Sequence, residues 1–430
     1  MLSVRDALAR SLATAPDPIA ETVVIDQAYG RVLAENVRAA SPLPPWDNSA
    51  MDGFAVRAQD TDLAGKGQAD QDPCDTRDIS PPIEGPWLTI VETVAAGQTP
   101  QIELQAGQAT RIMTGAPMPK GADSVVMQER TRSEAGRVQI HEAAKAGQHV
   151  RYAGEDVQLD AIVLHQGQTI RPASVGLAAA VGRTHLKVFK QPTVGIISTG
   201  DEIVLPGLPL GPGQIYSSNT PALMGLVREA GAIPIDCGIA RDDLAATRKA
   251  FETAAKCDLI VSTGGVSVGD FDVVKEAMSG LGAEMQFWKV RMKPGKPLAL
   301  GLIKQTPAFG LPGNPVSCQV GFLQFVRPWI RTAMGDTKPF LPVIQARLAV
   351  PYSKRAGRCE FVRVTLHVED GMWVANLSGH QGSGNQTSME SAHGLMLLSN
   401  SEHTLSAGES VPVQLLGNPP GQSNDGYPWE

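Results

Sequence analysis

The stretch DLIVSTGGVSVGDFDVV, residues 258–274, decides how the centre of this chain folds. It begins as an apolar run typical of a buried strand, changes to Ser, Thr and two adjacent glycines, and places Asp270 and Asp272 just beyond them. Glycine lets a ligand approach the backbone closely, exposed N–H groups suit anions, and hydroxyl groups add donors. A single loop of this kind is more often a tight turn whose acidic residues cap the next helix, so its neighbours decide the interpretation.

Two further predicted strand ends carry loops of similar make-up: STGDE at 198–202 and LPGNPVS at 311–317. Strand and helix patterns alternate throughout 192–336, which predicts a mostly parallel sheet covered by helices. Ligands of such sheets bind outside the carboxyl ends of the strands, so three such loops together favour a binding site. Acidic residues at its rim would repel a phosphate unless a divalent cation lay between them. The loops therefore predict a phosphorylated ligand bound with Mg²⁺.

The rest of the chain divides into regions of different composition. The expected fold class is multidomain α/β plus β, with a three-layer α/β domain as its centre. We expect a small discontinuous N-terminal α/β domain (1–56 and 151–188), an inserted β-rich domain (57–150), the α/β domain (189–337), a C-terminal β-barrel (338–417) and a flexible tail (418–430). The polar, glycine-rich segment 59–86 is expected to be an exposed loop.

Size, charge and cysteine usage narrow the class of protein. A chain of 430 residues is too long for one core. A net charge of −7 argues against a general nucleic-acid or membrane surface, and no apolar run approaches membrane-spanning length. The five scattered cysteines form no CxxC motif and make a disulfide framework unexpected. We therefore expect a cytoplasmic protein with small-molecule substrates, and with neither nucleic-acid nor membrane partners.

A cluster of cations lies in FWKVRMKPGKPLALG, residues 287–301. Lys289, Arg291, Lys293 and Lys296 fall within this stretch with no acidic residue among them. A charge run is usually a solvated face, but this one is interleaved with apolar residues and held by two prolines. Lysines fixed in this way suit a small anion.

A different chemistry is suggested by GVSVG, 265–269, which fits the GxSxG nucleophile elbow of serine hydrolases and would make Ser267 the nucleophile. That elbow needs one tight turn followed at once by a helix, whereas here extra glycines lengthen the turn and acidic residues surround the serine. Neither GxGxxG nor GxxxxGK[ST] occurs at these strand–helix turns, which leaves dinucleotide and P-loop sites unsupported.

Taken in order, seven motifs resemble the molybdopterin molybdenumtransferase family, which includes bacterial MoeA and the E domain of gephyrin. They are PPWDNSAMDGFAV, RIMTGAPMPKGAD, RYAGEDV, GIISTGDEIV, STGGVSVGDFD, KPGKP and LPGNPVS, and the resemblance runs from about residue 1 to 415. It implies an enzyme that inserts molybdate into adenylylated molybdopterin with Mg²⁺ and releases AMP and the molybdenum cofactor. It also implies a homodimer whose active cleft is shared between subunits.

The resemblance assigns roles to residues of this sequence. The substrate-binding set is Thr199, Gly200, Thr263, Gly264, Gly265, Ser267, Pro312, Gly313 and Asn314. The expected metal ligands and catalytic carboxylates are Glu202, Asp242 and Asp272. Lys293, Lys296, Ser317, Arg358 and Ser383 match the molybdate pocket, and Lys289 joins them from the cation cluster. Asp52 and Thr114 are expected to take part in catalysis by closing the cleft from the partner subunit. One departure is Ser217, where the family pattern leads us to expect an aspartate.

Three other functions stay open from the sequence. The related adenylyltransferase that makes the substrate uses similar Ser/Thr–Gly loops, although the full four-region chain favours insertion. A non-catalytic binding or scaffolding module would use the same fold, and a serine hydrolase would use Ser267. Transient contacts with the adenylyltransferase and with molybdoenzyme maturation factors are also expected partners.

Overall fold

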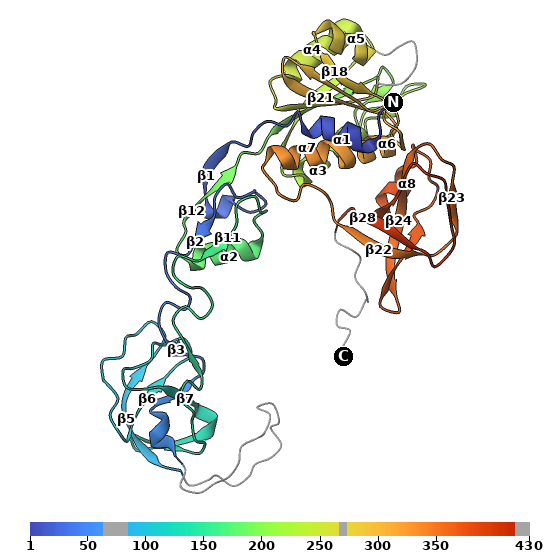
Figure 1. The fold of residues 1–430 in the computed structure, drawn as a ribbon. Coiled ribbons are helices and arrows are strands. Elements are labelled where there is room, and N and C mark those ends of the chain that lie inside the picture. The colour runs from blue at the N-terminus through green and yellow to red at the C-terminus, as the bar shows by residue number, and fades with distance from the viewer. Residues whose placement is uncertain (63–84, 266–272, 418–430) are drawn as a thin grey trace.

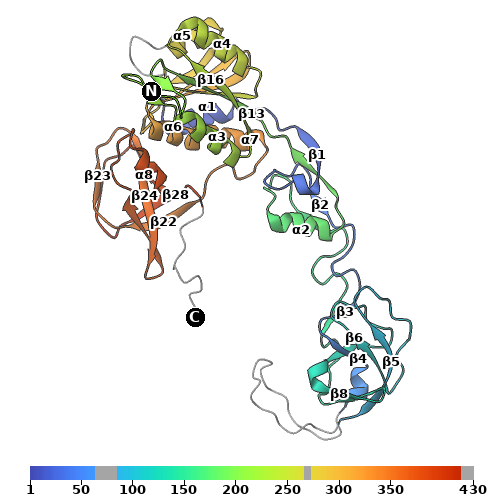
Figure 2. The same cartoon turned by 180° about the vertical axis from the view of Figure 1, so that it is seen from behind.

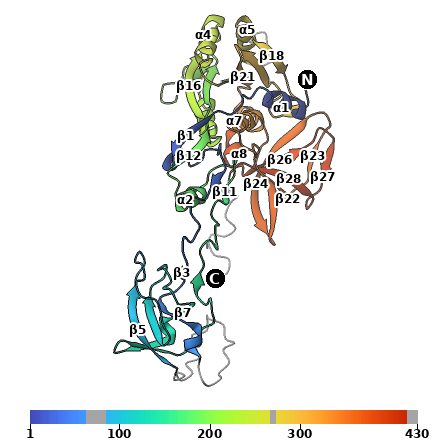
Figure 3. The same ribbon diagram turned by 60° about the vertical axis from the view of Figure 1, so that its left-hand side comes forward.

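The computed structural model describes residues 1–62, 85–265 and 273–417 (Figure 1). An α/β region and a β-barrel lie side by side at one end of the molecule, and a β-rich region lies at the other end in all three views (Figures 1, 2 and 3). A small region built from two separate chain segments joins them. This architecture confirms the expected multidomain α/β plus β fold. No helix in the described ranges is long and apolar enough to cross a membrane.

The α/β region is built on a six-stranded sheet in the order β16-β13-β17-β21-β20-β18. Its strands are β13 (Thr193–Thr199), β16 (Ile233–Ala240), β17 (Leu259–Thr263), β18 (Glu284–Trp288), β20 (Ala299–Ile303) and β21 (Thr306–Leu311). The first four strands in that order are parallel, whereas β20 pairs antiparallel with both β21 and β18. Lys304 and Gln305 join β20 to β21 with positive φ angles of 47° and 75°, as a tight hairpin requires. The sheet is therefore mostly parallel, as predicted, with an antiparallel edge.

Helices cover both faces of this sheet. They are α1 (Val4–Leu12), α3 (Asn219–Glu229), α4 (Leu244–Ala254), α5 (Val273–Gly280), α6 (Pro315–Gly321) and α7 (Arg327–Ala333), with a π-helical turn at Phe322–Val326 between the last two. Figure 2 shows α4 and α5 on one face and the others on the opposite face. Ile196 packs into one apolar core and Ile197 into the other, because successive strand residues point to opposite faces. The expected three layers follow from this alternation.

The C-terminal region is a closed barrel of five strands. They are β22 (Val343–Leu348), β24 (Cys359–Glu369), β25 (Met372–Leu377), β26 (Gly394–Leu398) and β28 (Ser410–Leu415). The long strand β24 pairs with both β25 and β26, and this closes the ring. Strand β19 (Met292–Lys293) leaves the α/β region to pair with the start of β24. Further elements of this region are β23 (Tyr352–Lys354), which pairs with β27 (His403–Leu405), and the short helix α8 (Gln386–Glu390).

Two distant chain segments form the joining region. Strand β1 (Ala20–Val24) pairs with β12 (His185–Phe189), and β2 (Val37–Arg38) pairs with β11 (Ile162–Leu164). Helix α2 (Pro172–Ala180) packs against the same core, which includes Leu33 and Leu186.

The β-rich region is a six-stranded sheet in the order β7-β4-β6-β5-β9-β8. Its strands are β4 (Gly53–Val56), β5 (Trp87–Val94), β6 (Gln108–Ile112), β7 (Ser124–Met127), β8 (Thr131–Glu134) and β9 (Arg137–Ile140), and β3 (Asn48–Ser49) pairs with β10 (Val150–Arg151) beside it. Strand β4 is fully buried and pairs on both sides, so this sheet begins before the expected residue 57. Most of the segment 59–86 lies outside the described residues.

Candidate functional site

Three loops with unusual composition meet at one edge of the α/β sheet. Ser198 of β13 pairs with Thr263 of β17, and Thr263 pairs with Leu311 of β21. The strands are parallel neighbours, so the loops that follow them lie side by side. The structure thus brings together the described parts of the STGDE, STGGVSVGDFD and LPGNPVS segments.

The glycines at these strand ends are explained by close backbone approach. Gly264 has a φ of +93°, and a Cβ there would collide with the carbonyl oxygen of Thr199 and lie 2.9 Å from its Oγ1. A Cβ on Gly313 would lie 3.5 Å from the Cα of Gly264. The chain therefore lacks side chains here because three backbones converge, and the same bareness leaves main-chain groups accessible to a ligand.

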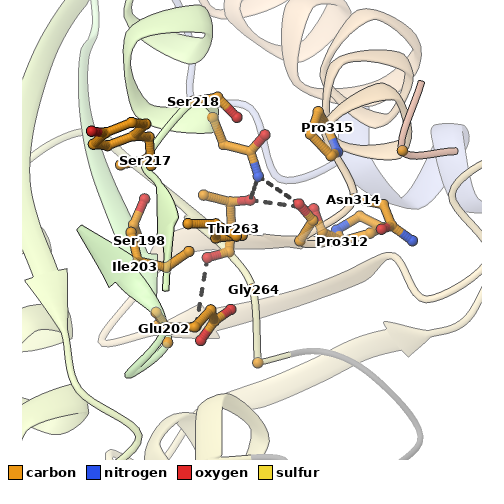
Figure 4. Close-up of a pocket in the computed structure, with 18 of the residues that line it drawn as sticks. Ser198, Glu202, Ile203, Ser217, Ser218, Thr263, Gly264, Pro312, Asn314 and Pro315 are labelled. Carbon is orange, nitrogen blue, oxygen red and sulfur yellow. Dashed lines mark hydrogen bonds between the residues drawn. The ribbon is translucent and has the colours of Figure 1, made fainter. Parts of the chain in front are cut away.

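The loops border a cavity of about 740 Å³ (Figure 4). Ten of the residues predicted to act on the substrate or the metal line it: Thr199, Gly200, Glu202, Asp242, Thr263, Gly264, Gly265, Pro312, Gly313 and Asn314. Ser267 and Asp272 lie outside the described residues. A cavity of this size suits a ligand as large as a nucleotide or a pterin.

Asn219 is a site residue that the sequence pattern did not reveal. Ser218 occupies the N-cap position of helix α3, and Asn219 is the first residue of that helix. Its Nδ2 donates hydrogen bonds to Thr263 Oγ1 and to the carbonyl oxygen of Gly313, both over 2.8 Å. Figure 4 draws hydrogen bonds as dashed lines between the residues that line the cavity, Thr263 among them.

The two strand-end threonines hold the loops together. Thr199 and Thr263 are 4% and 3% exposed. Thr263 Oγ1 accepts from Asn219 and donates to the carbonyl oxygen of Pro312 over 3.2 Å, so its hydroxyl is already engaged. The N–H groups of Gly200 and Gly264 already donate to the carbonyl oxygens of Ala240 and Leu311, each over 3.2 Å. The start of helix α3, where the helix dipole favours negative charge, is therefore the feature best suited to an anion.

Two carboxylates lie at the rim of the cavity. Glu202 folds over Gly200, where a Cβ would lie 2.8 Å from the carboxylate carbon of Glu202. Asp242 precedes helix α4 but does not cap it, because Asp243 accepts the N–H groups of Ala245 and Ala246 over 3.1 and 3.0 Å. Both rim carboxylates are exposed and available to a cation. Within the described ranges, no group of three or more His, Cys, Asp or Glu residues is placed to hold a metal ion.

An apolar wall faces these acids. Strands β14 (Ile203–Val204) and β15 (Ile215–Tyr216) pair beside the cavity, and Ile203, Ile215 and Tyr216 line it. The Tyr216 hydroxyl donates to the carbonyl oxygen of Leu208 over 3.1 Å. Ser217, the departure from the family pattern, is buried and donates to Thr220 Oγ1 over 3.2 Å. A polar contact therefore remains at this position, but it is directed into the protein.

The residues predicted to bind molybdate lie beside the cavity and do not line it. Lys293 and Lys296 are exposed, and Lys293 Nζ is 3.2 Å from Glu360 Oε1. Glu360 Oε2 also accepts from the Tyr352 hydroxyl over 2.9 Å, and burial followed by this hydrogen bond raises the pKa of Tyr352. Because Lys293 of β19 pairs with Glu360 of β24, the structure places Lys293 beside the start of the strand that Arg358 precedes.

The other three members of this set differ in accessibility. Ser317 is buried in helix α6, and its carbonyl oxygen would lie 3.5 Å from a Cβ on Gly295. The Ser383 carbonyl oxygen accepts the N–H of Val316, at the start of the same helix, over 3.1 Å. Lys289 is half-buried, has a φ of +77°, and accepts at its carbonyl from the N–H of Leu2 over 3.4 Å. Its backbone is thus tied to the N-terminus.

Asp52 and Thr114 lie together, but in the β-rich region at the far end of the molecule (Figures 1 and 3). Asp52 Oδ1 accepts both the N–H and the hydroxyl of Thr114 over 2.7 Å. The backbone bond, and then the hydroxyl bond, lowers the pKa of Asp52. One chain therefore does not bring these two residues to the cavity.

Comparison with known proteins decides the family. Residues 2–182 match the model of the MoeA N-terminal region (domain I and II), 195–332 match a "Probable molybdopterin binding domain", and 345–416 match the MoeA C-terminal region (domain IV). Molybdopterin molybdenumtransferase 2 of Mycobacterium tuberculosis (strain ATCC 25618 / H37Rv) is 39% identical over 91% of this chain and 94% of its own. The chain belongs to the molybdopterin molybdenumtransferase family. It is an enzyme of molybdenum cofactor biosynthesis.

Other members of the molybdopterin molybdenumtransferase family support the same assignment. The Nostoc sp. enzyme (strain PCC 7120 / SAG 25.82 / UTEX 2576) is 38% identical over 97% of this chain and 94% of its own. A crystal structure of a molybdopterin biosynthesis moea protein from Pyrococcus horikosii has a TM-score of 0.76 and 32% identity, and covers 97% of this chain and 100% of its own. The family's fold is therefore present over nearly the whole length.

Proposed function

We propose that this molybdopterin molybdenumtransferase inserts molybdate into adenylylated molybdopterin and releases AMP, with Mg²⁺ bound beside the scissile phosphates. The observation that carries the proposal is the convergence of three bare strand ends and the start of helix α3 on a cavity of about 740 Å³. The dipole at the start of helix α3 suits a diphosphate, and the apolar side chains of Ile215 and Tyr216 suit a planar ring.

The donor set at the rim fits Mg²⁺. This ion usually binds through one or two carboxylates together with substrate phosphates, and Glu202 and Asp242 supply two carboxylates on the same cavity. Asp272, the third predicted ligand, is outside the described residues. When bound, Mg²⁺ would neutralise phosphate charge. The chain's own groups then position the substrate: the start of helix α3 faces the phosphates while a water oxygen attacks phosphorus, the bridging P–O bond breaks, and the diphosphate is divided into AMP and the pterin phosphate.

Molybdate would bind next to the cavity. Lys293, Lys296 and Arg358 form an exposed basic group where strand β19 meets strand β24, and basic side chains hold tetrahedral oxyanions by charge-assisted hydrogen bonds. Ser383 directly precedes cavity residue Gly384 in the chain, and its carbonyl oxygen accepts the N–H of Val316 over 3.1 Å. This arrangement supports molybdate entering from the side of the barrel, adjacent to the bound pterin.

A homodimer would complete the site. Asp52 and Thr114 form a bonded, exposed pair at the opposite end of the chain from the cavity (Figure 1). We propose that this pair closes the cavity of a partner subunit, which an elongated chain can do in an antiparallel dimer. Sedimentation equilibrium, and activity regained on mixing an Asp52→Asn chain with an Asp242→Asn chain, would test this arrangement.

The test of the proposed function is AMP release from purified adenylylated molybdopterin with Mg²⁺, with and without molybdate, by wild type and by Asp272→Ala. Release that molybdate stimulates in the wild type and that the variant loses is the expected result. Wild-type protein that binds the adenylate but releases no AMP would overturn the proposal and favour the binding-module alternative. Labelling of Ser267 by a fluorophosphonate would instead favour hydrolase chemistry.

A further inference from the structure

The barrel reaches the cavity through residues 380–386, here called the 380–386 loop. Gly384 and Gln386 line the cavity. Gln386 Nε2 donates to Ser218 Oγ over 3.1 Å, just before helix α3. The Ser383 carbonyl oxygen accepts the N–H of Val316 at the start of helix α6 over 3.1 Å. The loop therefore spans the starts of two helices on the α/β region and forms the barrel-side wall of the cavity.

Arg363, in strand β24, holds this loop from the outer face of the barrel, because the flanking Val362 and Val364 point into the barrel core. Its side chain is among the largest fully buried ones, and the residue is 0% exposed. Nε donates to Ser388 Oγ over 2.9 Å, and Nη2 donates to the carbonyl oxygens of His380 and Gly382 over 3.0 and 3.1 Å. The backbone N–H and carbonyl of Arg363 pair with the side chain of Gln381 over 3.0 and 3.1 Å. One residue thus fixes both sides of the loop.

Arg363 places a guanidinium at a fully buried position, where an apolar side chain would be more usual. Taking a guanidinium out of water is costly, and well-packed apolar residues often stabilise a core at least as well. The neighbours of Arg363 on the strand, Val362 and Val364, are buried apolar residues. What a guanidinium adds is a rigid, planar set of donors that fixes the orientation of several carbonyl groups at once. The hydrogen bonds of its side chain go to the loop that forms the cavity wall and to helix α8, which begins at Gln386.

We propose that Arg363 is a positioning residue of the enzyme: it holds the 380–386 loop over the starts of α3 and α6, so that Gly384 and Gln386 contact the bound substrate. This inference rests on the proposed function, because it takes the cavity as the substrate site. Loosening the loop removes one wall of the cavity without touching the carboxylates or the strand ends. Substrate affinity then falls while the chemical step is largely kept.

Lys354 offers a matched control in the same barrel. It is also buried, 7% exposed, and its Nζ donates to the carbonyl oxygens of Ser399 and Ser401 over 2.9 and 2.6 Å. Neither serine lines the cavity. Arg363→Met and Lys354→Met therefore each remove a buried cation that binds loop carbonyls, but only the first affects the cavity wall.

The experiment compares KM, kcat and melting temperature for the full-length wild type and both variants. Both variants should melt at lower temperature, whereas only Arg363→Met should raise the KM for adenylylated molybdopterin, by about tenfold, because small misplacements of a binding group are costly. Arg363→Lys should recover part of this loss. An equal KM in Arg363→Met and Lys354→Met, measured where both are folded, would overturn the inference.

Two further measurements cover the cases in which Arg363→Met does not fold or the wild type releases no AMP. If Arg363→Met does not fold, Gln386→Ala removes the exposed contact with Ser218, and a KM unchanged from wild type would overturn the wall assignment. If wild type releases no AMP, the proposed function fails, yet the dissociation constant of AMP, measured by calorimetry on the same proteins, still decides the role of Arg363. A Kd of AMP that rises in Arg363→Met but not in Lys354→Met supports the positioning role of Arg363. Equal Kd values in the two variants contradict that role.

Discussion

Asn219 and Thr263 are joined by a hydrogen bond of 2.8 Å that connects helix α3 to the end of strand β17 (Figure 4). The same amide nitrogen donates to the carbonyl oxygen of Gly313, and the Thr263 hydroxyl donates to the carbonyl oxygen of Pro312. One side chain therefore ties the helix to the ends of two strands at the floor of the cavity. The shape of the candidate site depends on this polar network as well as on the sheet.

Replacing Asn219 by Ala should weaken ligand binding. It removes two hydrogen bonds, each worth about 1 kcal/mol, and leaves the Gly313 carbonyl without this donor. We expect the Kd of AMP, measured by calorimetry, to rise about tenfold. Asn36→Ala is the control, because Asn36 accepts one bond, from the Gln166 N–H over 2.9 Å, in the joining region. Equal AMP affinity in the two variants would contradict the role of Asn219.

Comparing Gly264→Ala with Gly207→Ala separates the cost of a steric collision from the cost of backbone strain. Gly264 and Gly207 have nearly the same φ, +93° and +95°, but a Cβ on Gly207 meets nothing within 4 Å. Gly207→Ala should therefore cost only the conformational penalty of about 1 kcal/mol. Gly264→Ala adds a collision with the backbone of Thr199 and should cost about 2 kcal/mol more. Urea denaturation measures both. Similar stabilities would show that the strand ends do not need to converge so closely.

The neighbouring residues Asp242 and Asp243 should respond differently to substitution. Asp242→Asn should raise the Mg²⁺ concentration for half-maximal AMP release about tenfold, because it removes a carboxylate from the rim. Asp243→Asn keeps a competent N-cap residue, so both stability and the Mg²⁺ requirement should change little, and Asp243→Ala should cost about 1 kcal/mol of stability. A magnesium titration that does not distinguish Asp242→Asn from wild type would remove Asp242 from the metal site.

The Asp52–Thr114 pair should make stability depend on pH in a defined direction. The bonds from Thr114 lower the pKa of Asp52 in the folded protein, so the pair stabilises the fold above the unfolded pKa. That contribution is lost as pH falls through the folded pKa. Thr114→Val removes the hydroxyl bond and should move the pKa of Asp52 upward, as followed by NMR of the carboxyl carbon. Its stability deficit should be present at neutral pH and vanish in acid; a deficit that persists in acid would assign it to packing.

The sequence allowed the sheet edge and its loops to be predicted for a simple physical reason. Parallel strands place their carboxyl ends at one edge, so the apolar runs before Thr199, Thr263 and Leu311 predict that the following loops meet. The closed barrel followed from alternating strands separated by turns.

The remaining features depend on contacts between residues far apart in the chain. Gln386 reaches Ser218 across 168 positions, and nothing near either residue indicates a partner. The inserted sheet begins at β4 because Gly53–Val56 pairs with strands more than 50 residues later, a pairing set by tertiary packing. Arg363 would be expected at the surface from its type alone, and only the loop it binds explains its burial.

A crystal structure of the full chain with adenylylated molybdopterin would test most directly whether the cavity at the strand ends binds the substrate. Density for the phosphates is expected against Gly264 and Gly313, with Gln386 of the barrel in contact with the ligand. A second cavity of about 280 Å³ is lined by residues that include Asp47 and Tyr152. Ligand density in that second cavity, with the cavity at the strand ends empty, would contradict the proposed site.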